Sequence, residues 1–241
     1  MTQLELREVR KSFQGFTLGP VTTTFGTGVT ALLGANGAGK STLMRIAVGI
    51  LRPDSGGVVS VDADPREVAP DIGYLPQDFA CPKNVTVTDY LRFVAWARSS
   101  RRRRLSDSDV AEALDRVGLS DRAGARIGTL SGGMVRRLGV GQALLGRSEV
   151  IVLDEPTVGL DPVQRRELRD LLRTLGADTT ILLSTHLSED VAAVATAVDV
   201  LHQGRIEMTG TVQELVARGP AGPVSGDTVE QGFLAVVGAV A

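Results

Sequence analysis

The chain has 241 residues, of which 43% are hydrophobic, 22% are charged and 4% are aromatic. This balance is typical of a globular protein, and the length suits one large domain or one core with an inserted subdomain. The net charge of −2 gives no indication of a nucleic-acid partner. The one cysteine, Cys81, cannot form an internal disulfide, which excludes a disulfide-stapled secreted fold.

Neither end of the chain has the pattern of a signal peptide or a membrane span. The first residues, MTQLELREVRKSF, lack the apolar core of a signal peptide. The longest apolar stretch, Phe233–Ala241, reaches about half of the ~20 residues that a membrane-spanning helix needs. We therefore expect a soluble, intracellular chain that reaches a membrane only through a partner.

Short apolar runs alternate with amphipathic segments, which predicts an α/β fold. The expected strands are Val29–Leu33, Val58–Val61, Ile72–Leu75, Val150–Leu153, Thr179–Ser184 and a hairpin of Val198–His202 with Arg205–Thr209. The expected helices are Lys40 to about Leu51, Thr88–Arg98, Asp107–Val117, one beginning at Asp161-Pro162, one capped by Ser188, and a short one begun by Thr211 and Glu214.

The spacing of these elements divides the chain. Between about 85 and 145 the pattern is helical, which indicates a helical insert between two groups of strands, and Ser106 and Gly118 bound one of its helices. After Ala217 the composition shifts to RGPAGPVSG. We expect one domain over residues 1–217, followed by a linker and a short C-terminal tail over 218–241.

The strongest motif lies between a strand and a helix. Residues Gly34-Ala-Asn-Gly-Ala-Gly-Lys-Ser41 fit the phosphate-loop pattern G-x-x-x-x-G-K-[ST]. In such a loop, glycines let backbone N–H groups close on phosphate oxygens, and the helix N-terminus adds partial positive charge. Lys40 is expected to bridge two phosphates, and the Ser41 hydroxyl to bind Mg²⁺. The expected nucleotide-binding residues here are Gly34, Ala35, Asn36, Gly37, Ala38, Gly39, Lys40, Ser41 and Thr42.

A second motif is the apolar run Val150–Leu153, which ends in Asp154 and Glu155. A strand buried on both faces should not end in adjacent carboxylates unless a metal or a substrate stabilises them. Asp154 suits the Mg²⁺ shell, and Glu155 suits polarising an attacking water as general base.

A third motif is Leu130-Ser131-Gly132-Gly133. With these three motifs in this order, the chain resembles the nucleotide-binding subunit of an ATP-binding cassette (ABC) transporter, over nearly its whole length. The resemblance implies a P-loop NTPase core with a mainly parallel sheet, an N-terminal antiparallel β part and an inserted α-helical signature subdomain. It also implies head-to-tail dimers, in which Ser131, Gly132, Gly133 and Asp161 face the partner's ATP. Ser131 would cap a helix whose first amides form a second anion site.

Three further residues take their roles from the same resemblance. Gln77, in Tyr74-Leu-Pro-Gln77, is similar to the Q-loop glutamine that reaches Mg²⁺. His186 is similar to the switch histidine that contacts the γ-phosphate and supports the attacking water. Phe13 is similar to the aromatic that stacks on adenine, with Phe16 as an alternative. The expected catalytic set is therefore Glu155, His186, Lys40 and Gln77, and Mg²⁺ is expected at Ser41, Gln77 and Asp154.

Other features are less specific. Met134 follows the signature where the family usually has Gln. The run Arg101–Arg104 is either a solvated loop or a contact with an acidic partner or anionic lipid. The ending Ser225–Leu234 is similar to that of exporter subunits of the ABC-2 or drug-resistance type with a separate membrane chain, or is an ordinary amphipathic helix.

These observations predict an ATP-binding and hydrolysing subunit that energises a membrane transporter, an exporter, by ATP-driven dimer closure. The expected cofactors are ATP and Mg²⁺, and the expected partners are a separate transmembrane permease and a second nucleotide-binding subunit. The chain would lie in the cytoplasm, peripheral to the inner face of the cell membrane. Two alternatives stay open: a soluble ABC ATPase acting on ribosomes, DNA or an assembly scaffold, and a P-loop small-molecule kinase, which would leave Ser131–Gly133, Gln77 and His186 unexplained.

Overall fold

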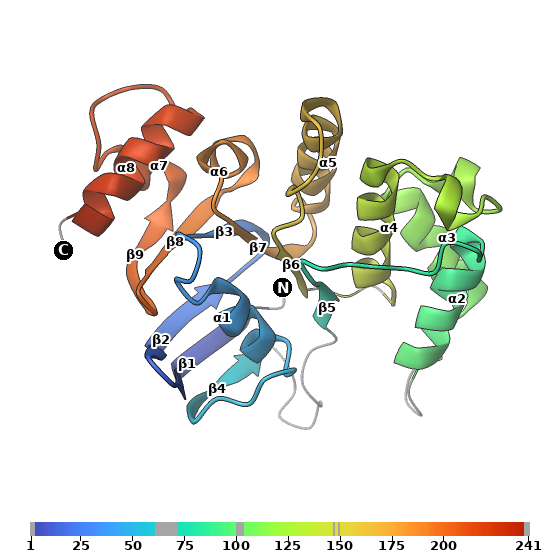
Figure 1. Ribbon diagram of the computed structural model, residues 1–241, viewed down its shortest axis with the longest axis horizontal. Helices are drawn as coiled ribbons and strands as arrows, with labels where there is room; N and C mark the ends of the chain where they lie inside the picture. The colour runs from blue at the N-terminus through green and yellow to red at the C-terminus, as the bar shows by residue number, and fades with distance from the viewer. Residues whose placement is uncertain (1–2, 61–71, 100–103, 147, 149, 239–241) are drawn as a thin grey trace.

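The computed structural model describes residues 3–60, 72–99, 104–146, 148 and 150–238. A six-stranded sheet in the order β5-β6-β7-β3-β8-β9 runs through its centre (Figure 1). Its strands are β3 (Gly28–Leu33), β5 (Ile72–Leu75), β6 (Val150–Asp154), β7 (Thr180–Thr185), β8 (Ala197–His202) and β9 (Arg205–Thr211). Neighbours in this sheet are parallel except for the β8–β9 hairpin, so the expected mainly parallel sheet is confirmed.

A second, antiparallel sheet is formed mostly by the N-terminal part of the chain, as expected. Its order is β2-β1-β4, with β1 over Leu4–Phe13, β2 over Phe16–Phe25 and β4 over Ser55–Ser60. Helix α1 (Lys40–Ala47) lies between the two sheets, because its buried side chains belong to one cluster with both. That cluster includes Leu6, Val21, Leu43, Met44, Val152 and Leu182.

The opposite face of the parallel sheet packs against the helical insert and α5. In β6, Val150 and Val152 face the α1 cluster, whereas Ile151 and Leu153 face the other side. This alternation is the period of a strand buried on both faces, which is why β6 is a continuous apolar run. The helices on that side are α2 (Val87–Arg98), α3 (Asp107–Arg116), α4 (Gly132–Leu144) and α5 (Pro162–Leu175), with 3-10 turns at Ser120–Arg122 and Ile127–Thr129.

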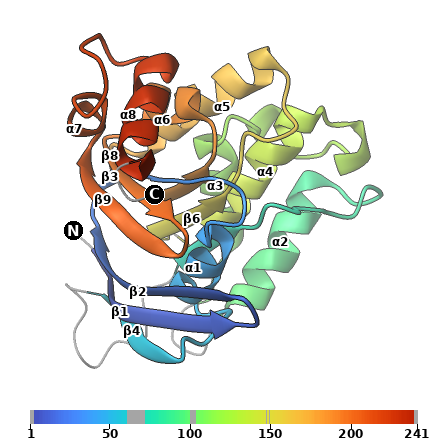
Figure 2. The ribbon, with the colours of Figure 1, turned by 60° about the vertical axis from the view of Figure 1, so that its left-hand side comes forward.

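A third cluster covers β8 and the end of β3. It is formed by α6 (Ser188–Val194), α7 (Val212–Val216) and α8 (Gly226–Gly238), which lie together in Figure 2. Val229 of α8 is fully buried there with Val198 and Leu215. The segment expected to be a linker and tail therefore contains a helix that packs on the core, while the division at residue 217 stays a prediction.

Helix α4 and strand β5 approach each other very closely. A Cβ built on Gly73 of β5 would lie 1.8 Å from the carbonyl oxygen of Ala143 in α4. A glycine is therefore required at this position for steric reasons. The contact fixes α4 directly against the strand that leads to Gln77.

Most element boundaries agree with the sequence, and two expectations are wrong. Helix α1 ends at Ala47 rather than near Leu51, because Gly49 takes φ +75° and a Schellman arrangement closes the helix. In it, Gly49 N–H donates to the Ile46 carbonyl and Ile50 N–H to the Arg45 carbonyl, at 3.0 and 2.9 Å. Ser188 is the first residue of α6 and not its cap. Leu187 holds the cap position, where its N–H donates to Thr185 Oγ1 at 3.0 Å.

Two features of the sequence concern a membrane. Among the described residues, no helix combines the length and the apolar character that crossing a bilayer requires. Of the Arg101–Arg104 run, only Arg104 lies within the described residues, so its expected contact with an acidic or lipid surface stays a prediction.

Asp199 of β8 is a buried carboxyl in the hairpin. It is 1% exposed, and its Oδ2 accepts a hydrogen bond from Thr23 Oγ1 at 2.6 Å. Burial raises the pKa of Asp199 above its usual 3.8, although the hydroxyls of Thr23 and Thr209 act in the opposite direction. At pH values between the pKa of Asp199 in the unfolded chain and its pKa in the folded chain, the folded chain therefore keeps a proton that the unfolded chain has released. The free energy of unfolding therefore falls as the pH rises from the unfolded to the folded pKa.

We predict that Asp199→Asn removes this fall, because the amide stays neutral and still accepts the Thr23 hydrogen bond. Urea unfolding midpoints, measured from about pH 4 to about pH 8, should increase for the variant relative to wild type as the pH rises. Glu230→Gln, at an exposed carboxylate of α8, is the control and should follow the wild-type curve. Equal pH dependence of Asp199→Asn and wild type would contradict the assignment.

Candidate nucleotide-binding and catalytic site

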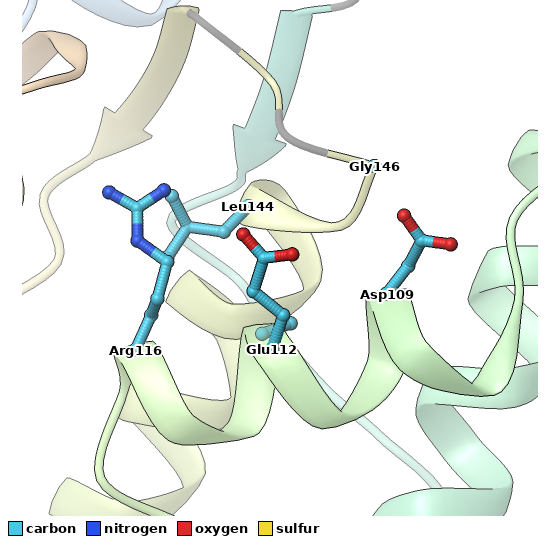
Figure 3. A pocket seen from close by; sticks show the side chains of 6 residues that line it. Asp109, Glu112, Arg116, Leu144 and Gly146 are labelled. Atoms are coloured by element: carbon cyan, nitrogen blue, oxygen red, sulfur yellow. The ribbon is translucent and has the colours of Figure 1, made fainter.

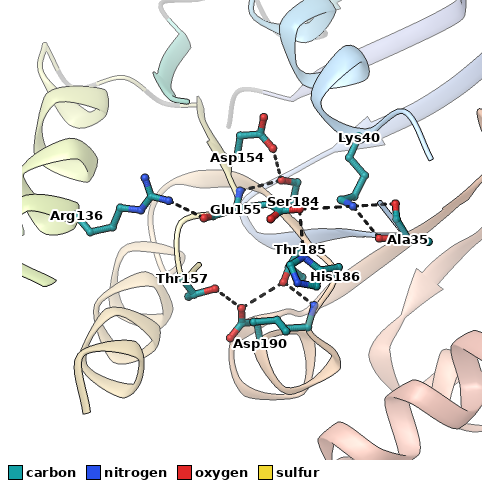
Figure 4. A network of polar contacts seen from close by, with 12 residues as sticks. Ala35, Lys40, Arg136, Asp154, Glu155, Thr157, Ser184, Thr185, His186 and Asp190 are labelled. Atoms are coloured by element: carbon teal, nitrogen blue, oxygen red, sulfur yellow. Dashed lines mark hydrogen bonds and ion pairs between the residues drawn. The ribbon is translucent and has the colours of Figure 1, made fainter. Parts of the chain in front are cut away.

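The loops that follow β3, β6 and β7 bring four of the expected residues to one edge of the sheet. These strands are parallel neighbours, so their carboxyl ends lie together, with Leu33 opposite Thr185 and Asp154 opposite Ser184. Lys40, Asp154, Glu155 and His186 meet at this edge (Figure 4). The strand order, and not the distance along the chain, determines this assembly.

Lys40 lies inside the glycine-rich loop. Its Nζ donates to the carbonyl oxygens of Gly34 and Ala35 at 2.7 and 3.1 Å, and lies 3.7 Å from Glu155 Oε1. Burial lowers the pKa of Lys40 from its usual 10.5, and the nearby Glu155 and Asp154 oppose that change. The ammonium is thus held at the centre of the loop, where a phosphate would meet it.

The N-terminus of α1 is suited to an anion. Its N-cap is Gly39, with φ +107°, and within the described structure no side chain caps the helix and no acidic residue lies in its first turn. The first amides of a helix need acceptors, and here a phosphate can supply them. At Gly39 a Cβ would also lie 2.9 Å from Phe16 Cζ, so the loop can pass this ring only with glycine there.

Ser184 joins the two carboxylates at the end of β6. Its Oγ donates to Asp154 Oδ1 at 2.6 Å and accepts from the Glu155 N–H at 2.9 Å. Asp154 is 1% exposed, so this hydrogen bond orients a carboxylate that bulk water barely reaches. The Asp154 carboxylate and the Ser41 hydroxyl are oxygen donors of the kind that Mg²⁺ prefers, and they fit the expected ion.

Glu155 occupies a backbone conformation that few side chains adopt. Its φ is +47°, in the left-handed region, and such strain at a functional position persists only when surrounding contacts hold it. The carboxylate is 8% exposed, and its Oε1 lies 3.2 Å from His186 Nδ1. Glu155 therefore lies between a lysine and a histidine, at the mouth of the loop.

Asp190, a buried carboxylate that the sequence analysis did not single out, lies close to the site in the chain. Asp190 of α6 is 0% exposed, and it accepts hydrogen bonds from Thr157, Thr185 and Arg169 (Figure 4). The Thr185 bond is 3.2 Å and the Arg169 Nε bond 2.6 Å. Asp190 thus joins the segment after Glu155, the residue before His186 and helix α5. The signal that the sequence offers for Asp190 is its place four residues after His186, next to the apolar Val191.

Unlike the other expected catalytic residues, Gln77 is connected to the site through its backbone and not through its side chain. Its side chain is exposed, but its backbone carbonyl accepts a hydrogen bond from Arg136 Nη1 at 3.1 Å. Arg136 of α4 also contacts the backbone beyond β6 (Figure 4). The sequence offered no signal for Arg136, since Arg137 beside it has the same chemistry. Binding of Mg²⁺ by Gln77 stays a prediction.

Phe13 and Phe16 flank the turn between β1 and β2. Their ring centroids are 6.5 Å apart at 28°, and Phe13 is 46% exposed. Phe16 is partly buried and packs near Gly39, as the close approach there shows. The exposed ring of Phe13 is thus available for stacking on a flat ligand, while Phe16 supports the loop.

The described contacts of the signature residues lie within α4 and against α5. Ser131 is exposed, and its Oγ accepts from Met134 N–H at 3.2 Å, so it caps α4 as expected. A Cβ on Gly133 would lie 2.9 Å from the Gln164 side chain, which places this turn against α5. Asp161 caps α5, since its Oδ1 accepts from the N–H groups of Val163 and Gln164 at 2.9 Å. These residues therefore have contacts within the chain, while their expected contact with a partner's ATP stays a prediction.

A pocket elsewhere in the described structure is separate from this site. It lies in the helical insert, where Asp109, Glu112 and Arg116 of α3 face Leu144 and Gly146 (Figure 3). It contains none of the glycine-rich loop or of the Asp154–Glu155 pair. The expected nucleotide-binding residues therefore lie outside this pocket, and their binding of nucleotide stays a prediction.

We predict that Ser184→Ala weakens the binding of the Mg²⁺ that nucleotide hydrolysis requires, because Asp154 loses the hydrogen-bond donor that orients it. The Mg²⁺ concentration for half-maximal rate should rise by about 10-fold or more, as is typical when a hydrogen bond to a metal ligand is removed. Ser148→Ala is the control, since Ser148 is also buried but lies before the opposite, amino-terminal end of β6, where it accepts from Arg98 Nη2 at 2.8 Å. An equal Mg²⁺ response in both variants would exclude this role for Ser184.

Comparison with known proteins identifies the family. The chain is 40% identical over 185 residues to the uncharacterized ABC transporter ATP-binding protein YxlF of Bacillus subtilis, covering 77% of this chain and 62% of the relative. It is 32% identical over 206 residues to the linearmycin resistance ATP-binding protein LnrL of the same organism, covering 83% and 64%. Rat phospholipid-transporting ATPase ABCA3 is 35% identical, over 76% of this chain and 11% of its own length. The chain thus spans less than two thirds of these relatives.

Solved structures give the same result for the fold. An ATP-binding cassette of an ABC transporter in its ADP conformation superposes with a TM-score of 0.77 at 25% identity, covering 89% of this chain and 92% of that one. CbiO1 of Clostridium perfringens, part of the transporter complex cbiONQ, gives 0.75 at 28% identity, covering 89% and 90%. The family profile described as ABC transporter matches residues 20–158, which include the glycine-rich loop, the signature and the Asp154–Glu155 pair. With this match over more than half of its length, the chain belongs to the ABC transporter family of ATPases.

Proposed function

We propose that the chain binds and hydrolyses ATP to drive a membrane transporter. The observation that carries this proposal is the position of Glu155, whose carboxylate lies 3.7 Å from Lys40 Nζ and 3.2 Å from His186 Nδ1. A base beside the phosphate-binding lysine, and next to a histidine, suits the attack of water on a terminal phosphate. A P-loop kinase would not need the capped signature turn at Ser131.

In this mechanism the water oxygen attacks the γ-phosphorus, and the bond to the bridging oxygen of ADP breaks. Glu155 takes the proton of the water, and a positioned base of this kind typically accelerates a reaction by about 10²–10⁴-fold. Lys40 and the α1 N-terminus stabilise the charge on the phosphate oxygens. His186 orients Glu155 and the water through its ring nitrogen. Bound Mg²⁺ would supply positive charge to the phosphates, with Ser41 and Asp154 holding it.

The signature residues complete the site from a second subunit. Ser131, Gly132 and Asp161 are exposed on the chain. A helix N-terminus at Gly132 offers amides to an anion, as α1 does. A head-to-tail dimer would place each signature turn on the partner's ATP, and ATP would then favour the closed dimer over the open one.

We predict that Glu155→Gln still binds ATP but holds it in a stable dimer, because the amide cannot take the proton from water. Size-exclusion chromatography with ATP and Mg²⁺ should show the dimer, and the turnover rate should fall by about 10²-fold or more. Glu167→Gln, at an exposed carboxylate of α5, is the control and should turn over like wild type. Rapid hydrolysis by Glu155→Gln would contradict the assignment of the base.

The proposed partner is a separate transmembrane permease, and export is the proposed direction of transport. Support comes from the relative named for linearmycin resistance, which aligns with 83% of this chain. The chain would then lie at the cytoplasmic face of the membrane. The same arrangement is consistent with the finding that no described helix could span a bilayer.

Helix α2 offers the surface that this permease would contact. Phe93 and Trp96 are 62% and 73% exposed, with ring centroids 6.0 Å apart. Exposed adjacent aromatics are typical anchors of protein interfaces, where burying each can contribute ~2 kcal/mol or more. The helix follows Gln77 by a short segment, so a partner seated on it would also lie near the catalytic edge.

We predict that Phe93→Ser combined with Trp96→Ser reduces recovery of the membrane subunit by at least about 10-fold, since two anchors are lost. The assay is a pull-down of tagged Glu155→Gln from the host in mild detergent with ATP, quantified by mass spectrometry. Ile50→Ser, at a side chain 64% exposed elsewhere, is the control. Recovery of ribosomal or DNA-bound proteins, with no multi-pass membrane chain, would instead favour a non-transport ATPase.

A further inference from the structure

Arg136 is a buried cation whose hydrogen bonds, among the described residues, go to backbone carbonyls. It is 9% exposed, on the second turn of α4. Its Nε donates to the Pro156 carbonyl at 2.6 Å, its Nη2 to the Glu155 carbonyl at 2.7 Å and its Nη1 to the Gln77 carbonyl at 3.1 Å. A planar guanidinium can span several acceptors in this way, which a lysine ammonium matches only in part.

Two of these acceptors belong to residues assigned to the reaction. Glu155 is strained at φ +47°, and both of its backbone polar groups are held from outside the loop. Its N–H donates to Ser184 Oγ at 2.9 Å, and its carbonyl accepts from Arg136. The same carbonyl also accepts from the Val158 N–H at 3.3 Å, within the loop itself. Removing Arg136 would therefore leave this strained peptide held on its carbonyl side by the loop alone, and the Glu155 carboxylate would be less firmly positioned.

Arg136 is also close to the signature turn, which is the start of α4 at Ser131. Arg136 lies five residues after Ser131 on one helix, which is about one and a half turns and roughly 7.5 Å along its axis. The same helix is fixed against β5 through the close approach of Gly73 to Ala143, and β5 leads to Gln77. A displacement of the signature turn is therefore carried by a stiff helix to the backbone of both Gln77 and Glu155.

We propose that Arg136 is a positioning residue that couples the signature turn of a subunit to the catalytic carboxylate of the same subunit. This inference rests on the proposed function, in which the signature turn binds the partner's ATP while Glu155 acts on the subunit's own ATP. Arg136 would then make hydrolysis at one site depend on occupation of the other. Arg137, the next residue, does not share this role: it lies partly exposed and pairs with Glu167 of α5 at 3.1 Å.

The test compares Arg136→Gln, Arg136→Lys and the matched control Arg137→Gln in the full chain assembled with its membrane subunit. ATP binding is measured with a fluorescent ATP analogue, and kcat, KM and the Hill coefficient are measured from hydrolysis. For Arg136→Gln we expect unchanged binding, a kcat lower by about 10²-fold, as a small misplacement of a catalytic group can cause, and a Hill coefficient of about 1. Arg136→Lys should recover part of kcat, and Arg137→Gln should match wild type.

Each outcome has a distinct meaning. A wild-type kcat and Hill coefficient in Arg136→Gln overturn the inference, and so does a Hill coefficient of about 1 in wild type itself. If Arg136→Gln does not fold, as judged by thermal unfolding, Arg136→Lys decides: wild-type kinetics in that variant overturn the inference, whereas lowered kcat with unchanged KM supports it. Absence of ATP hydrolysis by wild type would instead overturn the proposed function, and with it the role of Arg136 that rests on that function.

Discussion

The desolvation of two adjacent carboxylates at the end of β6 constrains much of this structure. Asp154 and Glu155 are 1% and 7% exposed, and charges buried to this extent need partners. Lys40 comes from the loop after β3, Ser184 and His186 from the end of β7. The parallel order β6-β7-β3 is therefore the arrangement that lets each carboxylate find its partner.

Two helix N-termini of the chain offer backbone amides that suit an anion. Glycine at position 39 leaves the first amides of α1 without a competing cap, and the short approach of Phe16 fills the space that a Cβ would need. At α4 the first turn begins with Gly132 and Gly133, one of which packs on Gln164. In the proposed head-to-tail dimer, two such helix ends from two chains would surround one nucleotide, so one subunit alone would present half of each proposed site.

Contacts between distant parts of the chain make the site rigid. Asp190 ties α6 to α5 and to Thr157, and Arg136 ties α4 to the backbone at Gln77 and Glu155. Fixed dipoles and charges need little reorganisation during a reaction, and this is the main way that phosphoryl-transfer enzymes lower a barrier. The strained φ of Glu155 is consistent with such preorganisation, because its neighbours hold it from both sides.

The sequence by itself determined the strands of the parallel sheet, most of the helices and the motif residues, since these depend on local patterns: strand period, cap chemistry at Asp161 and Thr211, and the loop Gly34–Ser41. Strands β1 and β2 were expected only as the antiparallel part that the family resemblance implies. The sequence misplaced the end of α1 and the start of α6, where a left-handed Gly49 and the Thr185 hydroxyl set the boundary. Only the tertiary structure decided that Arg136 and not Arg137 enters the site, that Ser184 and Asp190 support it, and that α8 packs on the core. The physical reason is that local conformation depends on neighbours in sequence, whereas burial and hydrogen-bond pairing depend on which strands and helices come together in space.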